Sequence, residues 1–120
     1  MTPQPTKARE VEVYELLLRA AMNRQSITAV YDDLPRLLCP HVLGRKGGRL
    51  QVLFYQFGGS SRRGLQANPW RCLAVDKLSQ VACDGDHWHT EPRSGRPTCI
   101  DEIDFDVDTQ PDPTPPQNGQ

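Results

Sequence analysis

"RLQVLFYQF", residues 49–57, is the stretch that decides the fold. Apolar side chains alternate along it with the period of two that is typical of a strand, and aromatic residues fill its second half. A tight basic turn, "RKGG", precedes it at residues 45–48, and a Gly- and Ser-containing loop follows it. The stretch therefore predicts one strand of a mainly β protein.

Further strands lie on both sides of this one. "SITAVYDD" (residues 26–33) reads as a strand that ends in a turn, and "RLLCPHVLG" (residues 36–44) as a second strand. Pro40 implies an edge or a bulge in that strand, because proline cannot donate to a ladder. "WRCLAVDKL" (residues 70–78) and "IDFDV" (residues 103–107) complete the set. Short strands punctuated by Gly and Pro indicate a small β-barrel of about five strands.

One helix is expected ahead of the strands. Apolar residues recur at helical spacing from Lys7 to about Arg24, and Thr6 can cap the helix. With 120 residues, the chain has the length of one small domain. We expect a disordered tail over residues 1–6, a domain over 7–108 made of the helix (7–24) and the barrel (26–108), and a disordered Pro-rich tail over 109–120.

Cysteine usage and hydropathy together predict a cytoplasmic protein with no membrane partner. No apolar run approaches the length of a membrane-spanning helix, and "MTPQPTKARE" lacks the apolar core of a signal peptide. A secreted protein could pair four cysteines into two bridges. We expect four free thiols instead, since the cytosol keeps thiols reduced. These are Cys39, Cys72, Cys83 and Cys99.

The order of the helix, "ITAVY", "CPHVLG", "GRLQVLFY" and "WRCLAVDKL" resembles the WYL domain, a small Sm-like, SH3-type β-barrel of bacteria and phages. The resemblance covers about residues 10–82. The matching residues are Tyr31, Pro40, Leu43, Gly48, Arg49, Arg71, Leu73, Val75, Asp76, Lys77 and Leu78. The naming Trp-Tyr-Leu triplet is replaced by Leu50, Gln51 and Val52. Many members are transcription regulators with a winged helix-turn-helix ahead of the barrel. Because a single helix is expected ahead of the barrel here, we expect a stand-alone binding domain.

The middle of the chain is basic. Seven basic residues and no acid lie between Leu34 and Val75, although the formal net charge of the chain is −1. Such a stretch favours the approach of a polyanion, whose neutralised phosphates release counterions. In the resemblance, Tyr31, His41 and Arg71 fall on or near the ligand groove, and Arg71 is the strongest candidate. The flanking turns supply Arg45, Lys46, Arg49, Arg62 and Arg63.

These residues predict a non-enzymatic domain that binds a nucleotide or single-stranded nucleic acid without a cofactor. Tyr31, Tyr55 and Trp70 could offer stacking faces to bases. The motifs of phosphate-binding loops, serine hydrolases and zinc proteases are absent from the sequence. Two alternatives stay open. The charges could simply be solvated, or the domain could bind a protein partner or a second copy of itself, which an exposed stripe at Val11, Leu18 and Met22 would favour.

Two features near the C-terminal end raise separate questions. Cys83, His87, His89 and Cys99 could in principle bind zinc, but their spacing is irregular and contains no C-x-x-C, so we predict no metal. Residues 101–120 hold six acids and no base, whereas residues 1–100 hold 14 bases and 9 acids.

We hypothesise that the first part of this stretch, residues 101–108, which we call the acidic segment, lies near the basic turns and competes with external anions. Ile103, Phe105 and Val107 would then dock while the carboxylates face outward. The alternative is an edge strand whose acids only face solvent.

Overall fold

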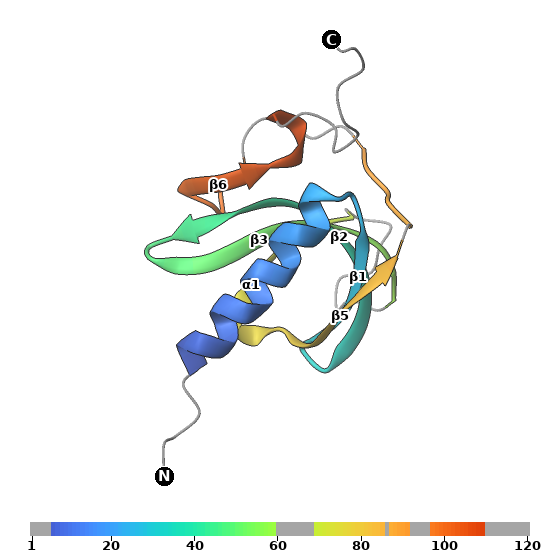
Figure 1. Cartoon of the computed structure of the whole chain (residues 1–120), viewed down its shortest axis with the longest axis horizontal. Coiled ribbons are helices and arrows are strands. Elements are labelled where there is room, and N and C mark those ends of the chain that lie inside the picture. The colour runs from blue at the N-terminus through green and yellow to red at the C-terminus, as the bar shows by residue number, and fades with distance from the viewer. Residues whose placement is uncertain (1–5, 60–68, 86, 92–96, 110–120) are drawn as a thin grey trace.

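The computed structural model describes residues 6–59, 69–85, 87–91 and 97–109, with side chains from Arg9 onward. One helix precedes six strands and two short 3-10 helices (Figure 1). The elements are α1 (Thr6–Met22), β1 (Ser26–Tyr31), β2 (Leu34–Lys46), β3 (Arg49–Gly59), β4 (Trp70–Ala74), η1 (Val75–Lys77), β5 (Ser79–Gly85), β6 (Glu102–Asp106) and η2 (Val107–Thr109). The expectation of a mainly β chain with one helix is confirmed. Both expected tails lie almost wholly outside the described residues.

The six strands form one antiparallel sheet in the order β4-β3-β2-β1-β5, and β6 pairs with β2. β2 is 13 residues long and pairs with β3 on one side. On its other side, its partner changes along its length. Its first part pairs with β1 through Leu34–Leu38, and its last part pairs with β6 through Val42–Arg45. Among the described residues β4 and β5 do not pair, so the curled sheet is not closed.

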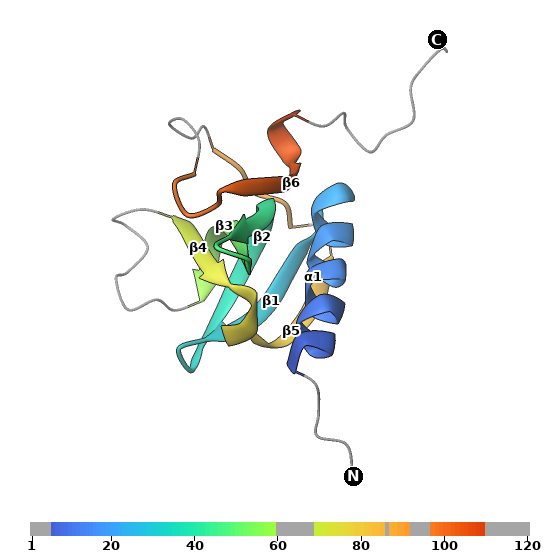
Figure 2. The same cartoon turned by 90° about the vertical axis from the view of Figure 1, so that its left-hand side faces the viewer.

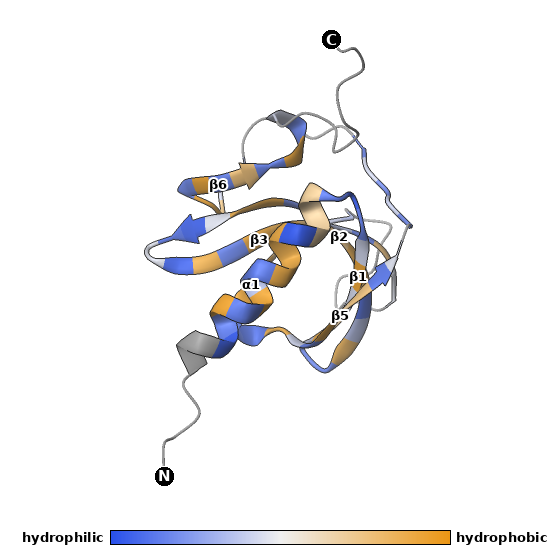
Figure 3. Ribbon diagram, in the orientation of Figure 1, coloured by the Kyte–Doolittle hydropathy of each residue, from blue (hydrophilic) through white to orange (hydrophobic). Residues whose placement is uncertain are grey.

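The main core lies between α1 and one face of the sheet, which we call the inner face (Figure 2). Leu17 and Ala21 of α1 are fully buried there, and Val52 and Phe54 of β3 meet them. Leu53, between those two, belongs instead to a second cluster on the outer face. Successive residues of β3 thus reach opposite faces, as the alternation in the sequence requires. Figure 3 shows that hydrophobic and hydrophilic residues also alternate along β6.

A β-bulge interrupts β2 at Pro40. The pairing with β3 shifts between Pro40 and Val42, so His41 is an extra residue on β2. This confirms the bulge predicted from Pro40. Because of the extra residue, His41 and Val42 both belong to the outer face: His41 packs against Trp70, and Val42 lies in the outer cluster.

The structure differs from the sequence-based expectations in three elements. α1 ends at Met22, two residues early, because Arg24 adopts a left-handed φ of 55°. The strand predicted over residues 70–78 is the short β4 followed by η1. β5 was not predicted, so the sheet has six strands against about five expected. No helix among the described residues is long and apolar enough to cross a membrane.

Candidate anion-binding surface

The predicted ligand residues lie in three separate places. Tyr31 packs against the main core, and Arg71 pairs with the core residue Phe54, so both belong to the inner face. His41 belongs to the outer face. Arg45, Lys46 and Arg49, which we call the basic turn, lie at the end of the β2–β3 hairpin. The structure therefore does not bring these residues into one groove, and Arg62 and Arg63 lie outside the described residues.

Two glycines shape the basic turn. Lys46 pairs with Arg49, which leaves Gly47 and Gly48 as a two-residue turn. Their φ angles are 58° and 80°, the left-handed values that a hairpin turn of this length needs and that glycine adopts without strain. An added Cβ would touch nothing at either position, so conformation and not space requires glycine there. The turn thus presents three cations within five residues.

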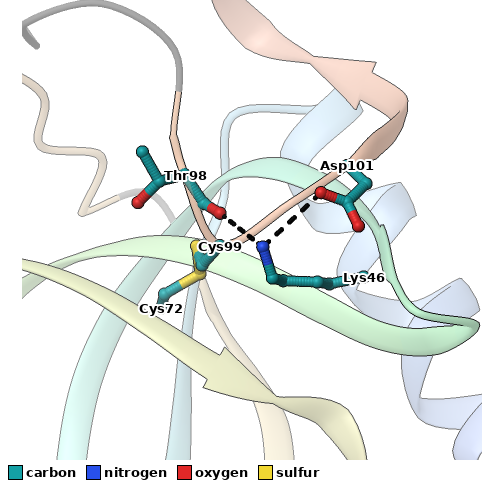
Figure 4. The surroundings of a disulfide bond; sticks show 5 residues. All are labelled: Lys46, Cys72, Thr98, Cys99 and Asp101. Carbon is teal, nitrogen blue, oxygen red and sulfur yellow. Dashed lines mark hydrogen bonds and ion pairs between the residues drawn. A yellow bond between two sulfur atoms is a disulfide. The ribbon is translucent and has the colours of Figure 1, made fainter.

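Each cation of the basic turn contacts a carboxylate of this chain. Nη1 of Arg45 lies 3.0 Å from Oδ2 of Asp104, and Nη2 of Arg49 lies 2.9 Å from Oδ1 of Asp76. Nζ of Lys46 lies 3.5 Å from Oδ1 of Asp101 (Figure 4). The three basic side chains are 42–50% exposed. Ion pairs this exposed contribute only about 0–1 kcal/mol each, so the turn stays open to exchange with other anions.

The acidic segment does lie along the basic turn. β6 pairs with β2, and Asp101 and Asp104 make two of the three ion pairs. The hypothesis on its position is confirmed, while competition with external anions stays a prediction. One detail was wrong: Ile103 and Phe105 do not share a face. Ile103 packs on the outer cluster and Phe105 on the main core, because the pairing shifts by one residue at Asp104.

Tyr14 adds a neutral contact to this arrangement. Its hydroxyl donates a 2.7 Å hydrogen bond to Oδ2 of Asp104 and so joins α1 to β6. Burial, and then the carboxylate of Asp104, raise the pKa of Tyr14 well above its usual value. Tyr14 therefore remains a donor over the whole neutral range and holds Asp104 in place beside Arg45.

A buried polar group on the inner face was missed by the sequence reasoning. Arg36 is 4% exposed, and its guanidinium carbon lies 5.1 Å from the centroid of the Tyr31 ring, a cation–π distance. It donates to Oε1 of Gln56 at 3.4 Å and to the carbonyl of Tyr31 at 3.2 Å. Arg71, 9% exposed, donates to the carbonyl of Trp70 at 3.1 Å. The sequence does contain a signal for the burial of Arg36, because this arginine occupies an inward position of an otherwise apolar strand.

The outer face carries an aromatic cluster. His41 is fully buried, and its ring centroid lies 4.9 Å from that of Trp70 and 4.6 Å from that of Trp88. His89 stacks on Phe57 with centroids 4.2 Å apart. Residues 87–91 thus lie over this face, and Trp88 also packs against the main core. Tyr55 and Trp70 contact one another here, away from Tyr31.

The expectation of four free thiols is wrong for Cys72 and Cys99, which form a disulfide (Figure 4). Their Cα atoms lie 6.5 Å apart, although 27 positions separate them in the chain. Cys99 is therefore committed to Cys72 and not to a metal site with Cys83. No group of three or more potential metal-binding residues gathers within the described ranges. Cys39 is buried and free, and Cys83 is exposed and free.

The two free thiols are expected to differ strongly in reactivity. Burial raises the pKa of Cys39 to about 11, so about one molecule in a thousand carries its thiolate at pH 8. With iodoacetamide at pH 8 and no reductant, we expect Cys83 to be alkylated and Cys39 to be spared. Peptide mass spectrometry reads both sites, and labelling in 6 M guanidinium is the control. Equal labelling of the native protein would contradict the burial of Cys39.

Comparison of the chain with protein-family models, curated proteins and solved structures finds no match. The resemblance to the WYL domain is thus carried by the motif residues alone.

Proposed function

We propose that this chain is a non-enzymatic binding domain for an anionic ligand, with a nucleotide or single-stranded nucleic acid as the leading class. One observation carries the proposal: the exposed cations Arg45 and Lys46 already hold carboxylate oxygens, supplied by Asp104 and Asp101. A phosphate group offers the same kind of acceptor with more charge. The basic turn is the proposed binding surface, and the acidic segment is its internal competitor.

An external phosphate can compete with these carboxylates on energetic grounds. The existing ion pairs are exposed, and each contributes about 0–1 kcal/mol. A polyanion that reaches Arg45, Lys46 and Arg49 together also releases counterions, which the short acidic segment does not. Arginine suits this role because its planar group can hold two phosphate oxygens at once.

The order of the elements supports a more specific assignment. We propose that the domain is an SH3/Sm-like small barrel of the WYL type and acts in transcription regulation in the cytoplasm. A helix first, a curled sheet in the order β4-β3-β2-β1-β5 and a 3-10 turn between β4 and β5 support this assignment. A disulfide in a cytoplasmic protein is usually transient or redox-sensing. A cytoplasmic location therefore implies that the bond between Cys72 and Cys99 is of this kind.

Titration of a labelled 12-nucleotide oligo-dT, followed by fluorescence anisotropy, tests the proposal. Arg45→Gln combined with Lys46→Gln is expected to weaken binding about ten-fold in 50 mM salt, because two phosphate contacts are lost. The slope of log affinity against log salt should fall by about 1.4. Arg19→Gln and Lys77→Gln together are the matched control, since both are cations outside the basic turn. Unchanged affinity in the basic-turn variant would rule out the proposed surface.

The alternative, a protein-interaction module, is favoured by one observation. Val11 and Met22 are each 48% exposed on α1, although Leu18 between them packs partly against the core. The stripe that would mark an interaction surface is therefore present only in part. Light scattering after size-exclusion chromatography tests it: an apolar interface should persist in 500 mM salt and be lost on Val11→Ser with Met22→Ser.

A further inference from the structure

We propose that the disulfide between Cys72 and Cys99 is a redox-controlled tether that keeps the acidic segment on the basic turn. Its reduction would let residues 97–104 leave Arg45 and Lys46 and so raise the affinity of the turn for anions. The proposal concerns regulation of the surface assigned above and therefore rests on the proposed function.

Cys99 lies close in the chain to the residues that contact the basic turn. It lies between Thr98, whose carbonyl accepts a 3.0 Å hydrogen bond from Nζ of Lys46, and Asp101, whose carboxylate contacts the same ammonium group (Figure 4). The backbone N–H of Asp101 also donates to the carbonyl of Arg45 at 2.7 Å. The disulfide thus fixes the chain directly beside its contacts with the basic turn.

The position of Cys72 carries the second step. It lies on β4, whereas β6 pairs with β2, and β3 separates these two strands in the sheet. The chain before β6 therefore crosses the outer face, where Cys72 and Cys99 pack against Val42, Leu53 and Ile100. The bond joins the chain just ahead of the acidic segment to β4, a strand with which β6 does not pair. Breaking it removes an anchor that the hydrogen bonds of β6 do not replace.

The remaining contacts suit a segment that opens and closes. The ion pairs of Asp101 and Asp104 are exposed and therefore weak. Ile100 and Val107 are 4% and 5% exposed, and Tyr14 holds Asp104, so the reduced segment keeps some anchorage. Reduction should consequently increase how often the segment opens and not unfold the sheet. The third ion pair, between Arg49 and Asp76 of η1, lies outside the tethered segment.

The chemistry requires a dithiol reductant. One of its thiolates attacks a sulfur of the disulfide and forms a mixed disulfide, and its second thiol then releases the protein. Two electrons pass to the protein, Cys72 and Cys99 each end as a thiol with one proton, and the reductant ends as a disulfide. Both cysteines are partly exposed, so a reductant can reach them.

Hydrogen exchange tests the tether without any ligand. We expect the β6 amides of the full chain to exchange about ten-fold faster in dithiothreitol than in the oxidised protein, with α1 unchanged. Cys72→Ser with Cys99→Ser should reproduce this without reductant, and Cys83→Ser is the matched control. Equal protection of β6 in oxidised and reduced protein would overturn the tether.

Anisotropy with the same oligo-dT tests its effect on binding. Reduction should raise the affinity about five-fold in 50 mM salt, and the gain should vanish in 500 mM salt. Asp101→Asn with Asp104→Asn should give the same gain in oxidised protein. Faster exchange of β6 with no change in a measurable affinity would overturn the regulation. Absence of binding in every state would instead overturn the proposed function, while exchange still reports on the tether.

Discussion

Phe54→Ala is expected to lower the free energy of unfolding by about 3–5 kcal/mol, the range for removing a buried aromatic ring. Phe54 is fully buried and is the largest such side chain in the described core. It lies on β3 opposite Pro40 and Arg71, in the cluster beneath α1. Pro40 cannot refill the space, because its ring restricts its conformation. Urea denaturation followed by far-UV circular dichroism measures the loss.

Phe57→Ala is the matched control for that experiment. Phe57 lies on the same strand but is only partly buried, and its ring stacks on the exposed His89. Because this contact is half in water, we expect a loss of about 1 kcal/mol or less. Equal losses for the two variants would show that the stabilising core is not centred between α1 and the inner face.

Replacing both Cys72 and Cys99 with serine is expected to cost about 3 kcal/mol in the free energy of unfolding. The bond closes a loop with a sequence separation of 27, and its removal restores conformational freedom to the unfolded chain. A denaturant titration of oxidised wild type against the double variant gives the difference. The variant should remain folded, because a domain of this size is typically stable by about 5–15 kcal/mol.

Cys83→Ser separates this effect from the loss of a thiol as such. Cys83 is exposed on β5 and forms no disulfide. We therefore expect the Cys83→Ser variant to have the same free energy of unfolding as the wild type. Wild type in dithiothreitol should in turn match the double variant. If reduction left the denaturation midpoint unchanged, the disulfide would not be a stabilising link.

Local patterns predicted much of the fold. The alternation in residues 49–57 predicted β3, the turn after "SITAVY" ended β1, and Pro40 marked a bulge. The sequence did not predict β5, because its apolar residues do not alternate with its polar ones and four of its seven residues are exposed. η1 was read as strand because Val75 and Leu78 are apolar, but Asp76 and Lys77 turn out to solvent.

The candidate site was harder to predict, because its geometry depends on long-range contacts. Trp70 and Arg71 are neighbours in sequence but belong to opposite faces of the sheet, so one groove cannot hold both. Because β2 contains one extra residue at the bulge, His41 lies on the outer face. The charge asymmetry of the chain did predict that the acidic segment meets the basic turn. Which carboxylate meets which cation depends on the register of β6, and no local pattern encodes that register.

The aromatic cluster on the outer face has a practical consequence for spectroscopy. The chain contains two tryptophans, and both pack against the imidazole of His41. Tryptophan fluorescence therefore reports chiefly on the surroundings of His41 and on residues 87–91 that lie over it, with a further contribution from the contact of Trp88 with the main core. Loosening of those residues would change the emission while α1 and its core were still intact. An emission change that precedes the change in circular dichroism would thus record the uncovering of His41 before the loss of the fold.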